Sequence, residues 1–547
     1  TINMFYKRVT SPKSFSRLRR SRMFVEELAS KVFHDFGEVA LLWLSIELIQ
    51  NSRYHMKRCW FILLLLLGFC SLLFGQGLEV DEAIYDALPR QSLYGDGGKS
   101  EATALDGIYK IDLKPFCPKP QNQGRISSCT AWATGYGALS IAYAIQFQQE
   151  GKQIVPSDSA FSALFLYNQV RDSLNDCGLG TFIHKTLDLL KEKGDVQSSV
   201  YDKGNNCKRL PNAVELANAQ RYRIKDWVSL FASNSANRVR IDKTKLSLAD
   251  KKPVIIAMRL RNNFMELGPD SKFWLPSIGD TSLSYNHAMV VVGFDDGKGA
   301  FEVMNSWGEA WGTKGFFWIR YEDYARHTLQ AFQLSLYPPG SKKALNPVAT
   351  NPKNQLSADL AVRFVKGVVD TNILFENAAF RHQQKGVYVL QGEPWPVGKL
   401  FQVSASNILG GSYLYVFSID AAQQVNVHWP RDAKLDEKFE GLNESAVISN
   451  TNVNLVIPTP KSGLKLEKIG DEYIGILVSK DPITNLNAIL QQLKNNPTLP
   501  LVDRLNKALG PAVIRPELLR YAPESIQFST ADLKGKIVPI LLKIPVK

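Results

Sequence analysis

The sequence lacks several features that would mark its function at once. It has no stripe of basic residues interleaved with aromatic side chains, so nucleic acid is a poor candidate partner although the net charge is +13. The surplus is uneven, because residues 1–58 hold 11 Lys/Arg against 5 Asp/Glu and the rest of the chain holds 54 against 47. No internal repeat of 20–50 residues occurs, so a repeat architecture is not expected. With 45% hydrophobic and 21% charged residues, the chain has the composition of a globular protein.

The one long apolar run is too short for a standard membrane helix. Trp60–Phe74 has 15 residues with almost no polar side chain, whereas a helix that spans a bilayer needs about 20. Lys57 and Arg58 precede the run and small residues follow it, which is the layout of a secretory signal peptide over residues 56–76. A permanent anchor is the alternative. Once the signal is removed, we expect no stable membrane span.

Residues 1–55 show no domain pattern. The chain begins with Thr1, and this first segment is rich in arginine. We therefore expect translation to start at Met56 and residues 1–55 to be a mis-assigned upstream extension. The protein would then be exported to a periplasmic, cell-surface or extracellular location, where disulfides persist. From the overall character of the sequence we expect a bacterial protein.

Beyond the signal, composition divides the chain into two folded regions. Residues 77–110 form a loose lead-in, and residues 111–337 have a mixed helix and strand pattern. Residues 338–356 are rich in Pro, Asn and Lys, as an interdomain linker is. Residues 357–547 alternate apolar and polar side chains and predict strands, with a helical segment near 484–508. The predicted strands lie at 360–367, 386–392, 400–406, 412–420, 423–430, 454–458 and 472–479, with a last one at the C-terminal end.

A single cysteine, Cys129, follows a polar stretch and opens a helical pattern. Trp132, Tyr136, Leu139 and Tyr143 recur at intervals of 4, 3 and 4, which predicts a helix that begins close to the cysteine. A thiol at that helix N-terminus lies at the positive end of the dipole, and its pKa is expected below the free value of about 8.5. A buried cysteine that only fills space is the alternative.

Two later segments supply a base and a hairpin. His287 opens the apolar run AMVVVGF, which is typical of a buried strand. Residues 301–321, FEVMNSWGEAWGTKGFFWIRY, contain two strand-like stretches around the sequence NSWG. His287 comes 158 residues after Cys129, and Asn305 comes 18 residues after His287. Alone, these segments also fit a structural histidine and a Gly-rich hairpin packed by aromatic side chains.

Together, the three segments resemble the papain-like cysteine peptidase family. The family has a Gln shortly before a helix-starting Cys, a His at the head of a strand and an Asn-Ser-Trp-Gly hairpin; Gln123, Cys129, His287 and Asn305 occupy these positions. In such enzymes His and Asn follow the Cys by roughly 130–150 residues, so modest insertions are implied. The resemblance covers residues 111–337. It implies an α+β fold with a helical lobe, a β-barrel-like lobe and a substrate cleft between them.

The resemblance also implies a role for each residue. Cys129 as a thiolate attacks the carbonyl carbon of the peptide bond, and His287 pairs with it and protonates the departing amine. Asn305 accepts a hydrogen bond from the other ring nitrogen, and Trp307 shields that bond from water. The side-chain amide of Gln123 and the backbone N–H of Cys129 stabilise the oxyanion. The implied substrates are polypeptides, and neither a metal nor another cofactor is implied.

The sequence departs from the family pattern in several places. Ile126 stands three residues before the nucleophile, where a disulfide-forming Cys is common, and Thr130 directly follows it. The resemblance implies a disulfide between Cys177 and Cys207, while Cys117 has no assigned partner and is most simply a buried free thiol. About 35 residues separate the signal from the first predicted strand. That length cannot hold the helical inhibitory propeptide of the family.

Residues 357–547 resemble a β-rich domain of unknown function found in bacterial exported and signalling proteins. A β-sandwich-like accessory module is expected there, and its His382 and His428 have no metal-like spacing. The module binds a substrate, a surface glycan or a partner protein, or it only stabilises the chain. The whole sequence predicts an exported cysteine peptidase. The alternatives are a cysteine exopeptidase and a catalytically silent papain-fold protein that binds or adheres.

Overall fold

The computed structural model describes residues 77–91, 105, 107–173, 175–202, 206–277, 285–337, 356–369, 372–449, 454–460, 462–495, 498–530 and 535–547. All of them belong to one compact unit, Phe74–Lys547. The expected upstream extension (1–55), the expected signal peptide (56–76) and the expected linker (338–356, apart from Leu356) lie outside the described residues.

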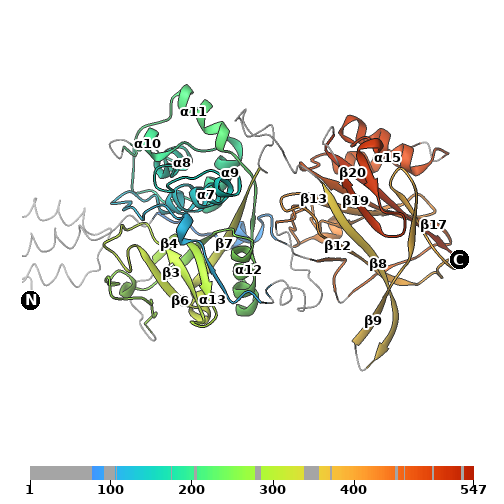
Figure 1. Ribbon diagram of the computed structural model, residues 1–547, viewed down its shortest axis with the longest axis horizontal. Helices are drawn as coiled ribbons and strands as arrows, with labels where there is room; N and C mark the ends of the chain where they lie inside the picture. Colours follow the sequence, from blue (N-terminus) through green and yellow to red (C-terminus); the bar gives the residue numbers. More distant parts are fainter. Residues whose placement is uncertain are drawn as a thin grey trace, which may run out of the picture. The chain divides into compact units, whose positions relative to one another are not determined.

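The first folded region, here called the α+β domain, combines a group of helices with an antiparallel sheet (Figure 1). Its long helical run begins at the cysteine that the sequence singled out and ends at Gln149. The helical elements are α6 (Cys129–Ala131), the π-helical segment η3 (Trp132–Leu139), α7 (Ser140–Gln149), α8 (Ala163–Val170), α9 (Ile183–Glu192), α10 (Ser198–Tyr201), α11 (Ala213–Ala219), α12 (Asn237–Ala249) and α13 (Tyr321–His327).

Two glycines allow the first helical run to lie deep in the domain. A Cβ atom at Gly135 would lie 2.8 Å from both Asp195 Oδ2 and Leu166 Cδ1, and one at Gly137 would lie 2.7 Å from Val290 Cγ2. Glycine lowers helix propensity, but here it lets η3 approach α8 and the sheet closely. The helical run therefore packs against both the other helices and the sheet.

The sheet of the α+β domain has seven strands: β1 (Lys110–Asp112), β2 (Ile224–Ser229), β3 (Val254–Leu260), β4 (Tyr285–Asp295), β5 (Ala300–Met304), β6 (Phe316–Arg320) and β7 (Thr328–Leu336). Their order is β2-β7-β3-β4-β5-β6, with β1 paired to β4, and every pairing is antiparallel. Strand β4 is central and buried over most of its length, as its apolar run predicts. The expected barrel-like lobe needs correction, because the described strands do not close: β2 and β6 stand at opposite ends.

The lead-in was expected to be loose, but residues 77–91 are ordered against the α+β domain. They contain a short helix, α4 (Glu82–Asp86), capped by the Asp81 carboxylate, which accepts a hydrogen bond from the Ile84 N–H at 2.8 Å. Tyr85 on this helix is 1% exposed, and its hydroxyl accepts a hydrogen bond from the Ala331 N–H on β7. A buried aromatic side chain therefore fixes this segment to the domain.

The C-terminal region is a sandwich of two sheets, consistent with the β-rich fold expected (Figure 1). One sheet has the order β10-β11-β20-β17-β13-β14; the other has the order β15-β12-β8-β19-β18, with β16 on β12 and β9 on β8. The bounds are β8 (Ser357–Val369), β9 (Asn372–Asn377), β10 (Phe380–Gln384), β11 (Val387–Leu390), β12 (Leu400–Ser406), β13 (Tyr413–Ile419), β14 (Val425–Trp429), β15 (Leu455–Ile457), β16 (Leu464–Lys465), β17 (Gly470–Ser479), β18 (Leu519–Tyr521), β19 (Ile526–Thr530) and β20 (Ile537–Val546).

Two apolar layers hold this C-terminal domain together. Residues such as Val362 and Val403 on one sheet and Ile476 and Leu542 on the other form a core between the sheets. The outer face of the six-stranded sheet is covered by α14 (Leu486–Gln492) and α15 (Leu501–Leu509), which form a second core. The helical segment expected near 484–508 is thus two helices.

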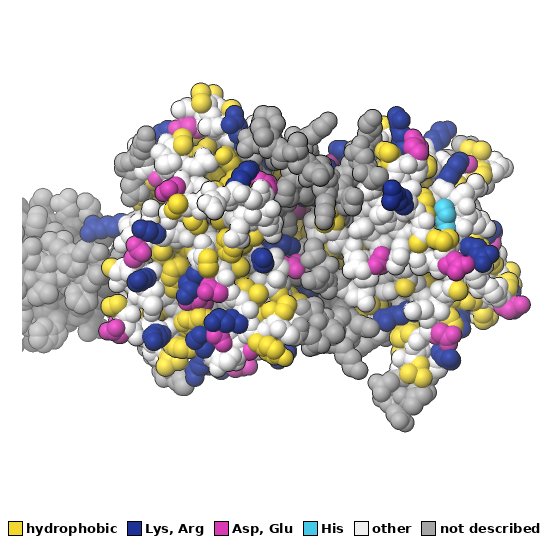
Figure 2. Space-filling model, viewed as in Figure 1, with side chains coloured by type: hydrophobic (Ala, Val, Ile, Leu, Met, Phe, Trp, Pro, Cys, Tyr) yellow, Lys and Arg dark blue, Asp and Glu magenta, His cyan; other side chains and the backbone are white. Residues whose placement is uncertain are grey.

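The molecular surface carries both signs of charge. On the face in view in Figure 2, Lys and Arg side chains are interspersed with Asp and Glu. Among the described residues, no helix is long and apolar enough to cross a membrane.

Two carboxyl groups in the helical part of the α+β domain have raised pKa values: Asp195 is buried and Asp202 is half-buried. Burial raises the pKa of Asp202 to about 6, against the opposing effect of the Ser162 hydroxyl, which donates a hydrogen bond to the carboxylate. Burial also holds the pKa of Asp195 well above its usual value, and Asp195 Oδ2 has no hydrogen-bond partner among the described residues. Both groups favour their protonated forms in the folded chain.

We predict that this domain loses stability as the pH rises through 6. The pKa of Asp202 is higher in the folded chain, about 6, than the usual value of 3.8 that the unfolded chain has. Such a group stabilises the folded state fully below pH 3.8, and this stabilisation is lost as the pH rises through 6. The shift of Asp202 is worth roughly 2–3 kcal/mol. Asp202→Asn should therefore raise the free energy of unfolding at pH 7.5 but change it little at pH 4, measured by urea denaturation. Asp158→Asn, at an exposed carboxyl of the same domain, is the control; an equal gain in both variants would contradict the prediction.

Candidate active site

Cys129 lies at the start of the helical run and is completely buried, with 0% exposure. The backbone N–H groups of Ala288, Gly77 and Thr130, with that of Cys129 itself, interact with its sulfur and oppose the rise in its pKa. Ala288 is the residue after His287 on β4, so the thiol and the strand that carries the histidine are in direct contact. The fold therefore brings together two segments that are 158 residues apart in sequence.

His287 is held by a hydrogen bond to Asn305. His287 Nε2 lies 2.8 Å from Asn305 Oδ1, and the same oxygen accepts a hydrogen bond from the Ser306 N–H at 2.8 Å. Because the Ser306 N–H needs an acceptor, the amide oxygen faces the ring, and Nε2 must carry a hydrogen. His287 Nδ1, which is buried without a hydrogen-bond partner among the described residues, is then the basic nitrogen of a neutral ring.

An aromatic group covers the histidine and its amide partner. The ring of Trp307 lies 5.0 Å from the imidazole, centroid to centroid, and packs against Phe264 and Trp311 at 5.4 Å and 5.3 Å. Trp307 is 6% exposed and His287 is 0% exposed. These rings keep water from the hydrogen bond between His287 and Asn305, and a hydrogen bond is stronger in such surroundings.

Gln123 is tied to the hairpin that carries Asn305. Its carbonyl oxygen Oε1 accepts a hydrogen bond from Ser306 Oγ at 2.6 Å, and its backbone N–H donates to the Ser306 carbonyl at 2.9 Å. Its Nε2 donates to the Ile126 carbonyl at 3.1 Å. The Ile126 carbonyl, which can only accept, fixes which end of the amide is the donor. These bonds hold the Gln123 side chain between the hairpin and the residues that precede Cys129.

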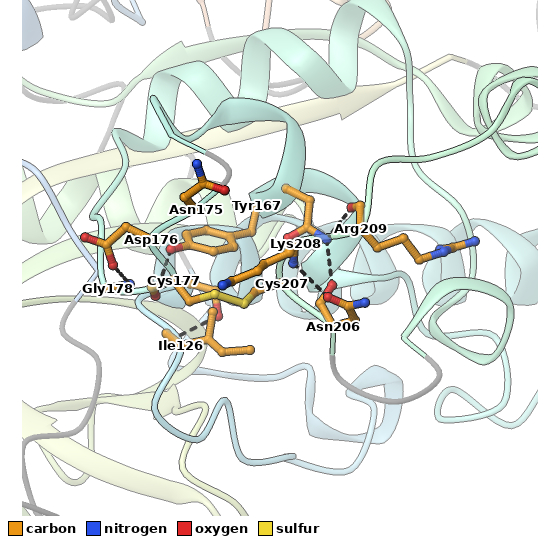
Figure 3. The surroundings of a disulfide bond; sticks show 12 residues. Ile126, Tyr167, Asn175, Asp176, Cys177, Gly178, Asn206, Cys207, Lys208 and Arg209 are labelled. Carbon is orange, nitrogen blue, oxygen red and sulfur yellow. Dashed lines mark hydrogen bonds between the residues drawn. A yellow bond between two sulfur atoms is a disulfide. The ribbon is translucent and has the colours of Figure 1, made fainter.

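The disulfide joins the loop beside Cys129 to a second loop of the helical part. Cys177 and Cys207, the expected pair, are bonded to each other (Figure 3). The Cys177 carbonyl accepts hydrogen bonds from the Ser127 N–H at 2.9 Å and from the Tyr167 hydroxyl at 3.0 Å. The bond therefore fixes the Cys177 loop next to the residues that precede Cys129. Cys117, in contrast, is a free thiol.

The lead-in passes directly over the thiol. The Thr181 N–H donates to the Gly77 carbonyl at 2.9 Å, and the Glu79 N–H donates to the Thr181 carbonyl at 3.0 Å, which makes a parallel β-bridge between Leu78 and Thr181. A Cβ atom on Gly77 would lie 1.7 Å from the Ser127 carbonyl oxygen. Only glycine can therefore occupy this place.

Burial changes the charge state of both reactive groups. It raises the pKa of the Cys129 thiol to about 11, although the four backbone N–H groups act in the opposite direction. It lowers the pKa of His287 to about 4 against the opposing effect of Asn305. The expected pKa below 8.5 for Cys129 is therefore wrong for this arrangement, because loss of hydration outweighs the helix terminus. Thiol and imidazole are both neutral at pH 7 here.

Four contributors to the site escaped sequence reasoning. Gly77 and Thr181 were not singled out, because a contact between a lead-in and a distant loop leaves no local pattern. Ser306 lay inside the quoted hairpin, yet its bond to Gln123 joins residues 183 positions apart. Phe264 follows from no spacing rule, although an aromatic side chain to pack on Trp307 could have been sought.

Comparison with known proteins places this geometry in a family. Residues 113–334 match the model of the papain family of cysteine proteases. These residues form a papain-family cysteine protease domain. It lies within the predicted limits 111–337 and makes the protein a cysteine peptidase whose substrates are polypeptides. The sequence resemblance to this family is confirmed.

The protease domain is also similar to several individual proteins. An uncharacterized peptidase C1-like protein of Acanthamoeba polyphaga mimivirus is 27% identical over 240 residues, which is 41% of this chain and 72% of the relative. Pro-cathepsin H of Medicago truncatula is 26% identical, over 36% of this chain and 52% of its own length. The gamete and mating-type specific protein A of Dictyostelium discoideum is 24% identical, over 38% and 42%. The chain thus spans about half of the length of pro-cathepsin H and less than half of the length of the Dictyostelium protein.

Solved structures of cysteine proteases are also similar to part of the chain. Xylellain from Xylella fastidiosa has a TM-score of 0.39 and 21% identity, over 48% of this chain and 96% of its own. Bromelain from Ananas comosus, in complex with the E64 inhibitor, has a TM-score of 0.33 and 16% identity, over 42% and 99%.

We predict that Ser306→Ala slows peptide hydrolysis through Gln123. Loss of the hydroxyl removes the bond that orients the amide, which is worth roughly 1 kcal/mol for a neutral hydrogen bond. In a Gly77→Ala background, in which a Cβ would meet the Ser127 carbonyl oxygen and displace the lead-in from the thiol, the turnover number kcat should fall about five- to tenfold, with KM nearly unchanged, in assays with a fluorogenic peptide. Ser306→Thr keeps a hydroxyl and should recover most of the rate. A loss confined to KM would show that Ser306 acts on substrate binding instead.

Proposed function

We propose that the protein is an exported cysteine peptidase in which Cys129 is the nucleophile, His287 the base and Asn305 the residue that orients the base. The observation that carries the proposal is the contact of the Cys129 sulfur with the backbone N–H of Ala288, next to a His287 ring whose tautomer is fixed by Asn305. These residues stand at the positions where the family signature has its Cys, His and Asn.

The reaction follows from these positions. Nδ1 of the neutral His287 ring takes the proton of the thiol, and the resulting thiolate attacks the carbonyl carbon of the peptide bond. The imidazolium then protonates the amine that leaves, and an acyl group stays on sulfur. Water, deprotonated by His287, releases the acid. Nε2 keeps its hydrogen throughout, because Asn305 Oδ1 accepts from it.

Gln123 is the proposed side-chain donor to the oxyanion. It lies six residues before Cys129, and its amide is oriented by Ser306. Together with the backbone N–H of Cys129, it would stabilise the negative oxygen of the tetrahedral intermediate. One such donor is worth about 3–4 kcal/mol in the barrier. Trp307 contributes by covering the bond between His287 and Asn305.

Substitution of Cys129 tests this proposal directly. In a Gly77→Ala background, in which the lead-in cannot take its place beside the thiol, hydrolysis of an unstructured protein should be measurable, and Cys129→Ala should reduce it by at least about four orders of magnitude. A thiol-specific epoxide inhibitor should label Cys129. Cys117→Ser, at the other free cysteine of the described chain, should change neither result. If neither cleavage nor labelling occurs with Cys129 present, the protein is a catalytically silent member of the family.

The pattern of products distinguishes an endopeptidase from an exopeptidase. Cleavage within the interior of the unstructured protein supports an endopeptidase, whereas stepwise shortening from one end supports the alternative. Mass mapping of early products separates the two, because an exopeptidase releases single residues or dipeptides from the first minutes.

The proposed export rests on two observations. Residues 56–76 have the layout of a secretory signal, and Cys177 and Cys207 form a disulfide, a bond that is rare in reducing compartments. We expect the native protein to be found outside the cytoplasm, with an N-terminus within a few residues of Gln76, established by intact mass and N-terminal sequencing. A native peptide from residues 24–52 would contradict both the expected start and the expected removal of the signal.

A further inference from the structure

The C-terminal domain touches the same lead-in that covers the thiol. Arg90 forms one β-bridge with Ser229 at the end of β2 and a second with Glu444 in the C-terminal domain. The Gln91 N–H donates to the Ser229 carbonyl at 2.7 Å. On the other side the Arg90 N–H donates to the Asn443 carbonyl at 2.8 Å, and the Ser445 N–H donates to the Arg90 carbonyl at 3.0 Å. The lead-in is thus a short strand between the two domains.

Side chains strengthen this three-part contact. Gln91, which is 6% exposed, donates from Nε2 to Ser449 Oγ at 2.7 Å, and Asn443 Nδ2 donates to the Asp86 carbonyl at 3.1 Å. The Ser449 carbonyl also accepts a hydrogen bond from Gln333 Nε2 at 3.1 Å. Residues 443–449 of the C-terminal domain are here called the clamp. The clamp binds the lead-in and the protease domain at once.

The two domains meet at the same strand by further buried contacts. The Tyr413 hydroxyl donates a hydrogen bond to Asp226 Oδ2 at 2.7 Å, and Val228 belongs to the apolar core that α14 and α15 cover. Asp226 and Val228 both lie on β2, which is an end strand of the protease sheet. An end strand offers unpaired backbone groups, and here the Pro89 carbonyl and the Gln91 N–H bond to Ser229 on β2, while the backbone of Arg90 bonds to Asn443 and Ser445.

We propose that the C-terminal domain is a latch: its clamp holds residues 86–91 on β2 and thereby keeps residues 77–80 across Cys129. Because α4 and the buried Tyr85 lie between these two ends, the clamp fixes the base from which residues 77–80 extend. It raises the effective concentration of this segment at the thiol. When the clamp disengages, the segment leaves and substrate enters.

Backbone groups of Gly77 make the contacts by which the segment covers the thiol. The Gly77 N–H is one of the backbone groups that interact with the sulfur. The Gly77 carbonyl is turned to the Thr181 N–H, which donates to it at 2.9 Å. The segment therefore covers the sulfur with an N–H group, while the Gly77 carbonyl is engaged by Thr181.

The test measures access to the thiol in the full-length chain. The double variant Asn443→Ala/Ser449→Ala removes two side-chain bonds of the clamp and leaves both the lead-in and the proposed catalytic residues intact. Alkylation of Cys129 by iodoacetamide, followed by peptide mass mapping, should become about five- to tenfold faster. Deuterium uptake should rise at residues 77–85 as well as at 86–91. The control Ser406→Ala/Asn487→Ala, which removes bonds to Asp359 and Lys434 inside the C-terminal domain, should match the wild type.

A second variant tests the end that lies on the thiol. In Gly77→Ala the new Cβ would meet the Ser127 carbonyl oxygen at 1.7 Å, so alkylation should accelerate at least as much as in the double variant. Gly268→Ala, where a Cβ meets nothing within 4 Å, is its control. Unchanged alkylation in Gly77→Ala would show that the lead-in does not limit access. Faster exchange at 86–91 alone in the double variant, with alkylation unchanged, would show that contacts at the thiol hold the segment without a latch.

This inference builds on the proposed function, but its test is separate from it. Alkylation needs an accessible sulfur and no turnover, so it reports on the latch even in a chain that cleaves nothing. Loss of peptide hydrolysis with intact, clamp-dependent alkylation would contradict the proposed function and leave the latch standing.

Discussion

The site depends on the contact between the N-terminal end of a helix and the middle of a sheet. Cys129 begins the helical run, and its sulfur accepts from the backbone N–H of Ala288 on β4. Two glycines let η3 come close enough for this contact, since a Cβ at Gly137 would meet Val290 on the same strand at 2.7 Å. The closeness of helix and strand is thus set by packing, and the chemistry of the thiol and the imidazole follows from it. Without the contact between the helical run and β4, Cys129 and His287 would not belong to one site.

The hairpin after β5 links the separate parts of the site. Asn305 and Ser306 are consecutive, and one orients His287 while the other orients Gln123. A small displacement of this hairpin would therefore misplace the base and the proposed oxyanion donor together. The aromatic side chains around Trp307 resist such a displacement, because close-packed rings transmit strain and do not yield. A tight arrangement of this kind suits a reaction whose rate depends on reacting atoms held about 3–3.5 Å apart.

Sequence reasoning succeeded where the signal was local. The period of Trp132, Tyr136 and Tyr143 predicted the helix that follows Cys129. β-branched and aromatic content predicted strands such as β13 and β17, which are packed on both faces over most of their length. It failed where a contact joins two segments that are distant in sequence and have no recognisable pattern of residues. The lead-in looked loose because its composition says nothing of Tyr85 entering the core. The pKa of Cys129 was misjudged for a related reason: the dipole of a helix can be inferred from sequence, whereas the loss of water around a buried sulfur cannot.

The closed arrangement suppresses the reaction by charge as well as by exclusion. A thiolate and an imidazolium are both stabilised by hydration, and burial removes that hydration. Burial therefore raises the pKa of Cys129 to about 11 and lowers the pKa of His287 to about 4. Proton transfer from sulfur to the ring is therefore unfavourable while residues 77–80 cover the site. Departure of the lead-in would admit water and polar substrate groups, and both pKa values would return toward their usual range. The proposed movement of residues 77–80 would thus both uncover the sulfur and favour its ionised form.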